Sequence, residues 1–312
     1  WSPLPTAANG WWVNRQSAKR SEWRRHDAAG DRGIDADGSG IGRCVAHELA
    51  SLGATVVLTG RTQEKLDKVA AEILEDGGKV DTAAFDIRDE DQVKAAVASV
   101  VAKHGRIHGL VNNAGGQFPS PLQAISKRGF EAVVANNLTG GFLMAREVFN
   151  QSMQKHGGAM VNMTADMWNG MPGMGHSGAA RAGMANLTKT AAFEWAVANV
   201  RVNAVAPGWI ASSGMDSYGP AMAGIIHDLK NKVPMRRMGL EAEVSSVICF
   251  LLSPGAAFIT GITLAIDGGA PFGLQLAQVS EQRGVSQPVH RRARICIHDP
   301  DELLHRARRL TQ

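Results

Sequence analysis

The sequence has few of the residues that build disulfide frameworks or membrane spans. Its 312 residues include a single tyrosine and three cysteines, Cys44, Cys249 and Cys296, with no CxxC pair. This cysteine pattern excludes a disulfide scaffold and is typical of reduced cytoplasmic thiols. No stretch reaches the ~18 consecutive apolar residues of a transmembrane helix, and the first residues lack the charged-then-apolar order of a signal peptide. We therefore expect a cytoplasmic protein without a membrane span.

The middle of the chain carries no surplus of positive charge. The net charge is +4, but residues 1–36 carry six Lys/Arg and four acids, and residues 279–312 carry seven Arg and four acids. The residues between them hold 20 basic and 21 acidic side chains. Nucleic-acid binding needs a basic face on the folded unit. We therefore expect no nucleic-acid partner, and the cysteine spacing likewise predicts no metal site.

The composition changes abruptly near Gly38 and again after Phe272. Four of the seven tryptophans lie in the first 23 residues without any helical or strand period, and the tail is rich in arginine. We expect three parts: an atypical, disordered N-terminal extension (1–36), one folded domain (37–272) and a basic, poorly ordered C-terminal tail (273–312). A second hypothesis is that the two ends come from another reading frame or exon.

Between these breaks, apolar runs alternate with amphipathic segments. Strands are predicted at 54–59, 80–87, 106–116, 158–164, 201–208 and 263–269. Helices are predicted at 38–53, 63–77, 89–105, 128–155, 176–200 and 241–252. This alternation indicates an α/β fold of the Rossmann type, in which a single doubly wound parallel sheet carries helices on both faces. Such a sheet binds its ligands beyond the carboxyl ends of the strands.

A glycine run opens the first predicted helix. Gly38, Gly40 and Gly42, with Ser39 and Ile41 between them, form a turn whose backbone N–H groups suit a pyrophosphate. Such a turn by itself is also common without any ligand. Its position before a helix and a second strand favours a dinucleotide cofactor.

The end of the next strand indicates which dinucleotide is bound. Gly60 and Arg61 occupy the place where an acid would bind the 2′-hydroxyl of NAD. A neutral residue followed by a cation suits the 2′-phosphate of NADP. We therefore expect NADP rather than NAD. The alternative is that Arg61 is a solvated residue at a helix start.

Several motifs together resemble the short-chain dehydrogenase/reductase family. They are GSGIG, DI at 86–87, NNAG at 112–115, NNLTG at 136–140, RVNAVAPG at 201–208 and IDGG at 266–269, and the resemblance covers residues 38–272. It implies a single Rossmann-type domain in a homodimer or homotetramer that uses NAD(P) on a small-molecule substrate. The residues that it implies at the cofactor are Asp86, Ile87, Asn112, Asn113, Ala114, Gly115, Pro207, Gly208 and Ser212.

Two groups within the family are particularly similar. GGQFPSPLQAIS, HSGAARAG and NLTK are similar to peroxisomal-type trans-2-enoyl-CoA reductases, and ADMWNGMPGMGHSGAARAGM is similar to bacterial citronellol/citronellal dehydrogenases. The resemblance fails upstream, where GDRGIDAD replaces the usual first strand and Thr-Gly. Asp35, Ala36 and Asp37 stand there, and acids near a pyrophosphate repel it. The first strand is therefore expected to be atypical.

The family's Asn-Ser-Tyr-Lys tetrad maps onto this chain by spacing. Asn137 fits the Asn, and Thr164, which lies 27 residues further on, fits the Ser. Ser177 and Arg181 stand where the Tyr and the Lys belong. The single tyrosine, Tyr218, lies in a loop that usually covers the substrate. A second Tyr-Lys spacing, within NLTK, also fails because residue 185 is an alanine.

This altered tetrad favours reduction of an enoyl-CoA over oxidation of an alcohol. Oxidation needs a base with a pKa near neutrality. An enoyl thioester needs only hydride addition, stabilisation of an oxyanion by donors such as Thr164 and Ser177, and a proton from water, Tyr218 or His176. The second hypothesis is a terpenoid alcohol/aldehyde dehydrogenase. The third is a catalytically impaired relative that acts as a binding or subunit partner, with Ser177 and Arg181 merely packing a helix.

Overall fold

The computed structural model describes residues 40–212 and 228–270. Strands and helices alternate there as the sequence predicts. The first half contains α1 (Ile41–Ser51), β1 (Thr55–Gly60), α2 (Gln63–Glu75), β2 (Lys79–Ala84), α3 (Glu90–His104) and β3 (Gly109–Asn112). The second half contains α4 (Lys127–Val134), α5 (Gly140–Val148), α6 (Gln154–His156), β4 (Gly158–Met163), α7 (Gly175–Trp195), β5 (Val200–Pro207), β6 (Ile210–Ala211), β7 (Gly239–Leu240), α9 (Glu241–Leu252) and β8 (Thr263–Ile266).

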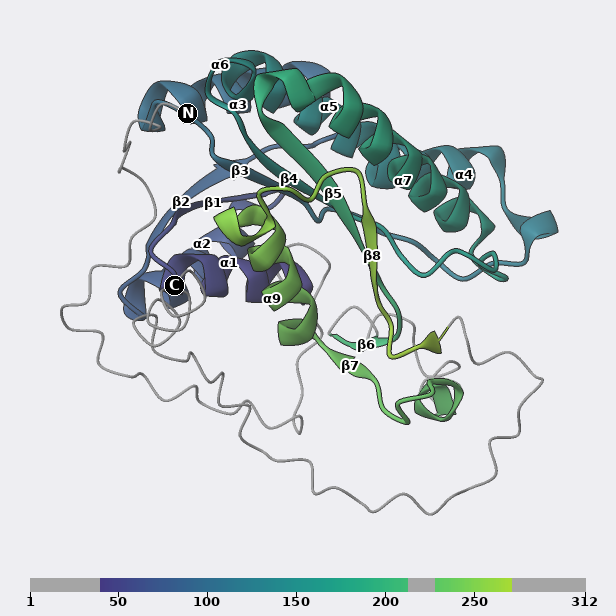
Figure 1. Ribbon diagram of the computed structural model, residues 1–312. Helices are drawn as coiled ribbons and strands as arrows, with labels where there is room; N and C mark the ends of the chain where they lie inside the picture. Colours follow the sequence, from purple (N-terminus) through teal and green to yellow (C-terminus); the bar gives the residue numbers. More distant parts are fainter. Residues whose placement is uncertain (1–39, 213–227, 271–312) are drawn as a thin grey trace, which may run out of the picture. The chain divides into compact units, whose positions relative to one another are not determined.

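Every strand pairing is parallel. One sheet has the order β3-β4-β5-β8, and a second pairs β1 with β2 over their full lengths. A short pair, β6 with β7, follows the end of β5. Parallel strands joined by helices predict helices on both faces, and Figure 1 shows α3, α5 and α7 above the strands and α1, α2 and α9 below them. The predicted doubly wound α/β fold is confirmed.

Apolar clusters on the two faces hold these layers together. On one face, Val45 of α1 and Ile248 of α9 pack with Val161 and Val205 of the sheet. On the other face, residues of α3, α5 and α7 surround Met160 of β4. The middle strands are accordingly buried on both sides, as their continuous apolar sequences predict.

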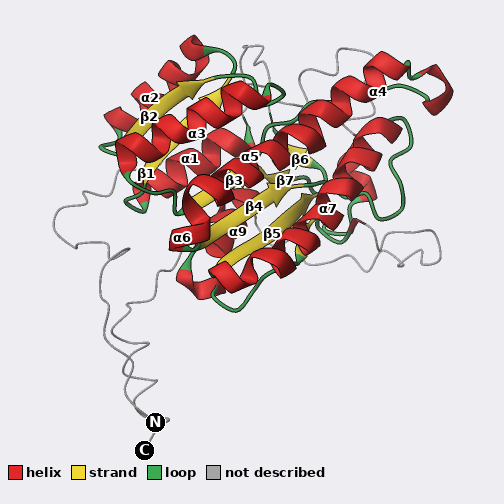
Figure 2. Ribbon diagram, turned by 90° about the horizontal axis from the view of Figure 1, so that it is seen from above, coloured by secondary structure: helices red, strands yellow, loops and turns green. Residues whose placement is uncertain are grey.

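The sheet is split between β1 and β3. Within the described residues, no strand pairs with the open edge of either one. Val56 and Leu58 of β1 and Val111 of β3 are only partly buried, whereas β4 and β5 are almost entirely buried. Figure 2 shows β1 and β2 as a group of strands apart from β4 and β5. The predicted atypical first strand lies outside the described residues.

Helices bridge this split. Val45 of α1 belongs to the cluster that contacts Val111 of β3, whereas the next residue, Ala46, packs against Val56 of β1. A helix is about 10 Å wide, which equals about two strand spacings of 4.8 Å. Helix α1 therefore packs against both groups of strands.

The long predicted helix at 128–155 is interrupted twice. π-helical turns at Ala135–Thr139 and Phe149–Met153 separate α4, α5 and α6. Such turns widen the helix locally and are frequent at functional sites. The first of them contains Asn137, which the sequence assigned to the site.

The described residues all belong to one unit of the chain, residues 1–273. A second unit, residues 274–312, lies outside the described residues, as do the expected N-terminal extension (1–36) and the whole expected C-terminal tail (273–312). Among the described helices, none combines the length and apolar content needed to cross a bilayer.

Candidate active site

The expected site residues lie at the carboxyl ends of the parallel strands. Arg61 follows β1, and Asp86 and Ile87 come shortly after β2. Asn113, Ala114 and Gly115 follow β3, Thr164 follows β4, and Pro207 and Gly208 end β5. Parallel strands place these ends along one edge of a sheet. Gly38, Ser39 and Tyr218 lie outside the described residues.

The amino end of α1 has the properties of a phosphate site. Gly40 begins it with φ of 73°, the glycine at this N-cap position has no side chain to cap the helix, and the first turn carries no acid. A Cβ on Gly42 would lie 2.5 Å from the Asn113 side-chain nitrogen. The helix end and the loop after β3 thus approach as closely as a glycine permits, and the N–H groups of a helix start are the kind of donors that a pyrophosphate needs.

Cations gather where the ribose end of a dinucleotide is expected. Arg88 binds the Asp86 carboxylate through Nε at 2.9 and 3.0 Å and through a shorter contact from Nη2. This pairing is the main reason why the pKa of Asp86 is lowered, and Arg61 contributes a smaller electrostatic lowering. The structure therefore places Arg61 near Asp86 and adds Arg88, which the sequence did not single out.

Three further residues that the sequence assigned to a cofactor occupy tight or ordered positions. Ile87 lies against Gly140, where a Cβ would approach it within 2.6 Å, and a Cβ on Gly208 would lie 2.8 Å from the backbone of Asp267. Ser212 follows β6, and its N–H donates to Ile210 at 2.8 Å. Nearby, the N–H of Asp166 donates to the Pro207 carbonyl at 3.1 Å. Burial, and secondly the charge of Asp267, raise the pKa of Asp166.

Asn137 clamps the loop after β3. Its Oδ1 accepts from the Gly116 N–H at 3.1 Å, and its Nδ2 donates to the Gly116 carbonyl at 2.6 Å and to the Val133 carbonyl at 3.0 Å. Asn137 is buried. Asn137, which lies in this π-helical turn, therefore holds the loop through both the N–H and the carbonyl of Gly116.

Arg181 lies directly beside this clamp. A Cβ on Gly115 would lie 2.5 Å from both Arg181 Nη2 and Asn137 Oδ1, so only glycine fits between them. Arg181 Nη1 donates to the Met163 carbonyl at 2.6 Å. Protein atoms surround the guanidinium although part of the side chain is exposed, and this desolvation lowers the pKa of Arg181 to about 10. It stays protonated at neutral pH.

Ser177 contacts a residue that the sequence did not single out. Its hydroxyl donates to Gln117 Oε1 at 2.5 Å, across 60 positions of the chain. Ser177 is fully buried whereas Gln117 is exposed. The motif GGQF contained Gln117, but no spacing rule connects it with α7.

The hydroxyl of Thr164 is bound to the backbone. It donates to the Val205 carbonyl at 2.8 Å, and the Thr164 N–H donates to the same oxygen at 2.8 Å. A hydroxyl has one proton. In this arrangement Thr164 links β4 to β5 and does not offer a donor to a substrate.

His176 is buried with one ring nitrogen unpaired. Its Nδ1 accepts from the Ser177 N–H at 2.9 Å, and Phe118 packs edge-on with ring centroids 4.5 Å apart. Nε2 is inaccessible and has no hydrogen-bond partner. Residues 115–118 thus contact Arg181, Ser177 and His176 in turn along the first two turns of α7.

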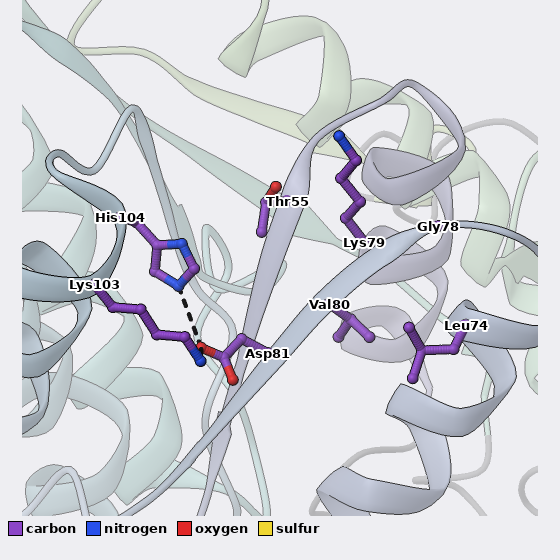
Figure 3. A pocket seen from close by; sticks show the side chains of 8 residues that line it. All are labelled: Thr55, Leu74, Gly78, Lys79, Val80, Asp81, Lys103 and His104. Atoms are coloured by element: carbon purple, nitrogen blue, oxygen red, sulfur yellow. Dashed lines mark hydrogen bonds and ion pairs between the residues drawn. The ribbon is translucent and has the colours of Figure 1, made fainter.

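A surface pocket lies away from these residues, at the amino ends of β1 and β2 (Figure 3). It measures about 320 Å³ and includes Thr55 and Lys79, the first residues of those strands. Asp81 there binds Lys103 at 2.6 Å and His104 at 3.2 Å. These charges pair with one another, so the pocket offers no reactive group.

The described residues contain no group of three or more His, Cys, Asp or Glu suited to a metal ion.

Comparisons with known proteins show relatives over most of the chain. The family model described as "Enoyl-(Acyl carrier protein) reductase" matches residues 35–271. A 3-oxoacyl-[acyl-carrier-protein] reductase of Thermotoga maritima is 37% identical over 74% of this chain and 93% of its own. A peroxisomal 2,4-dienoyl-CoA reductase of Danio rerio is 32% identical over 76% and 80%. The solved structure of a citronellol catabolism dehydrogenase of Pseudomonas aeruginosa is 62% identical over 75% and 91%, with a TM-score of 0.68.

Proposed function

Because the chain belongs to the short-chain dehydrogenase/reductase family of NAD(P)-dependent oxidoreductases, we propose that it reduces the enoyl double bond of an acyl-CoA with NADPH. The chemistry at α7 carries this proposal. Ser177 and Arg181 stand where the family resemblance puts an acid–base Tyr-Lys pair, and Arg181 is a cation whose pKa of about 10 keeps it charged. A fixed charge suits oxyanion stabilisation better than proton abstraction.

NADPH, when bound, supplies a hydride for the β carbon of the enoyl group. The residues that would hold it are those at the amino end of α1, the loop after β3, Arg61 near its 2′-phosphate and Ser212 near its carboxamide. As the hydride adds, the C=C electron pair moves toward the thioester carbonyl and negative charge develops on its oxygen. The charge of Arg181, desolvated beside Gly115, lowers the energy of that state.

A proton at the α carbon completes the reduction. Water and Tyr218 are the candidate donors, because the third candidate from the sequence, His176, has an inaccessible Nε2. Tyr218→Phe removes only the phenol, so a donor role predicts a fall in kcat of about 10²–10⁴-fold. A packing role predicts little change with Phe and a raised KM with Ala. Near-parental kcat in Tyr218→Phe would remove Tyr218 from the mechanism.

Oxidation of a terpenoid alcohol is the second candidate function. The observation that favours it is the 62% identity to the citronellol catabolism dehydrogenase. That oxidation requires a base close to the substrate hydroxyl. Asp166 lies near the site, and burial raises the pKa of its carboxyl group, so it is the candidate base. Asp166→Asn would abolish such an oxidation and leave enoyl reduction largely unchanged.

The deciding experiment measures NADPH consumption by the full chain. Crotonyl-CoA and longer enoyl-CoAs are compared with citronellal, and citronellol is offered with NADP⁺. We expect turnover of an enoyl-CoA. Turnover of the terpenoids alone favours the second function. NADPH binding without any turnover favours a catalytically impaired binding or subunit partner.

Further features of the protein belong to the same proposal. We propose that the enzyme prefers NADPH to NADH, works in the cytoplasm and forms a homodimer or homotetramer through the helices at 128–155 and 176–198. We also propose that residues 37–272 form the catalytic domain. Light scattering at micromolar concentration tests the oligomer, and a monomer there would contradict it.

A further inference from the structure

Two loops without charged side chains flank the start of α7. Residues 114–126 follow β3 and residues 167–174 precede α7, and neither segment contains an Asp, Glu, Lys or Arg. The loops are joined by a hydrogen bond from the Ser120 N–H to the Gly173 carbonyl at 2.7 Å. The first loop also contacts Arg181 through Gly115. The two loops therefore form one uncharged surface that continues from the candidate site.

Large apolar side chains on these loops remain accessible. Phe118, Leu122 and Trp168 are 41%, 70% and 51% exposed, and Met171 is partly exposed. We call these four residues the apolar patch. Side chains of this kind are usually buried, and a group of them left exposed marks a surface that binds an apolar partner.

Two glycines of α7 set the positions of two patch residues. A Cβ on Gly175 would lie 2.8 Å from Leu122 Cδ1, and a Cβ on Gly178 would lie 3.2 Å from Met171 Cβ. Residues three positions apart share a helix face. Leu122 and Met171 therefore cover the same face of the first turn of α7, although they come from different loops.

The patch lies beyond the reach of a short acyl chain. Arg181, which the proposed function places at the thioester oxygen, is about 9 Å along the helix axis from Gly175. A crotonyl group is shorter than this distance, whereas a longer chain extends over the first turn of α7. The loops offer no cation for the phosphates of CoA, so a neutral hydrocarbon is the part of the substrate that suits them.

We propose that the apolar patch binds the hydrocarbon chain of the substrate and makes the enzyme selective for medium- and long-chain acyl-CoAs. The inference rests on the proposed function, because the chain is that of the enoyl thioester. It adds residues that determine specificity and take no part in the reaction itself. A contact of this kind stabilises the ground state and the transition state equally, so it lowers KM and leaves kcat nearly unchanged.

The dependence on chain length tests the proposal. Each methylene group moved from water to an apolar contact favours binding about fourfold. trans-2-Octenoyl-CoA is four methylene groups longer than crotonyl-CoA. With half of that added surface covered, we expect its kcat/KM to be about 10- to 20-fold higher, with the gain in KM. Saturated octanoyl-CoA, which cannot be reduced, should bind more tightly than butanoyl-CoA by the same factor in calorimetry with the full chain.

Substitutions in the patch locate the effect. Leu122→Ala and Trp168→Ala should each reduce the octenoyl-to-crotonyl ratio of kcat/KM by about 3- to 5-fold, the loss of about one methylene contact. Because the ratio is taken within one variant, a general loss of active enzyme cancels. Leu74→Ala is the matched control, since Leu74 is an exposed leucine at the amino ends of the strands and should leave the ratio unchanged.

The outcomes separate this inference from the proposed function. Equal kcat/KM for the two enoyl-CoAs overturns the inference alone. Tight binding of octanoyl-CoA without turnover of any enoyl-CoA supports the chain site and overturns the proposed function. A changed oligomeric state of Leu122→Ala in light scattering, with an unchanged ratio, would assign the patch to a second copy of the chain and refute the inference. Turnover of citronellal without binding of octanoyl-CoA overturns both.

Discussion

Asn137→Ala tests how strongly the π-helical turn holds the loop after β3. The side chain makes three hydrogen bonds, two to Gly116 and one to Val133. Each is worth about 1 kcal/mol net, and buried groups left unpaired cost about 1–3 kcal/mol each. Some of the freed groups will regain water, since Gly116 is exposed. We expect the free energy of unfolding to fall by about 3–5 kcal/mol, a large part of the 5–15 kcal/mol typical of a domain.

Urea unfolding followed by circular dichroism measures this loss. Asn186→Ala is the matched control, because Asn186 is an exposed asparagine on α7 and should change stability by no more than about 0.5 kcal/mol. The substitution should also lower kcat/KM under conditions where the variant remains folded, since Gly115 of this loop lies against Arg181. A loss below about 1 kcal/mol would show that the three bonds do not hold the loop.

Three further predictions follow from single residues. Arg61→Ala should reduce the preference for NADPH over NADH by about tenfold or more, since a charge-assisted contact is worth about 1.5–3 kcal/mol; equal binding of both cofactors by the parent would refute the assignment. Burial raises the pKa of Asp166, so ionisation costs the folded state more than the unfolded one and stability is lost as the pH rises through the folded pKa. The Tm advantage of Asp166→Asn should therefore grow from pH 4 to pH 7, and a constant difference would contradict it. Burial raises the pKa of the Cys249 thiol to about 12. In a Cys296→Ser background, Cys249 should therefore react with iodoacetamide at pH 8 far more slowly than Cys44, which is less buried. Equal reaction rates of the two thiols would refute this ranking.

The alternation of apolar and amphipathic segments was sufficient to predict the fold, because each parallel strand must be apolar on both faces and each helix on only one. Predicted segments such as 158–164 and 201–208 match β4 and β5 closely. The spacing of Asn137, Ser177 and Arg181 likewise predicted residues that the structure brings to one loop. Periodicity is a local property, and these features are encoded locally.

The contacts that decide the chemistry are not encoded locally. Ser177 and Gln117 are 60 positions apart and meet because the loop after β3 runs beside the start of α7. The direction of the Thr164 hydroxyl depends on Val205, 41 positions away. The π-helical turn at Asn137 was not predicted, because the sequence pattern indicated one continuous helix over 128–155.

The gap between β1 and β3 has a consequence for cooperativity. Arg61 and Asp86 follow the two-stranded group, whereas Ser177 and Arg181 pack beside the four-stranded group, so the two ends of a bound dinucleotide would contact different bodies. Within the described residues β1 pairs with one strand and β4 with two, so local opening of β1 breaks fewer of the described bonds than opening of β4. Amide protons of β1 should therefore exchange with deuterium faster than those of β4. A ligand that contacts both groups of strands, as NADPH would, should slow that exchange.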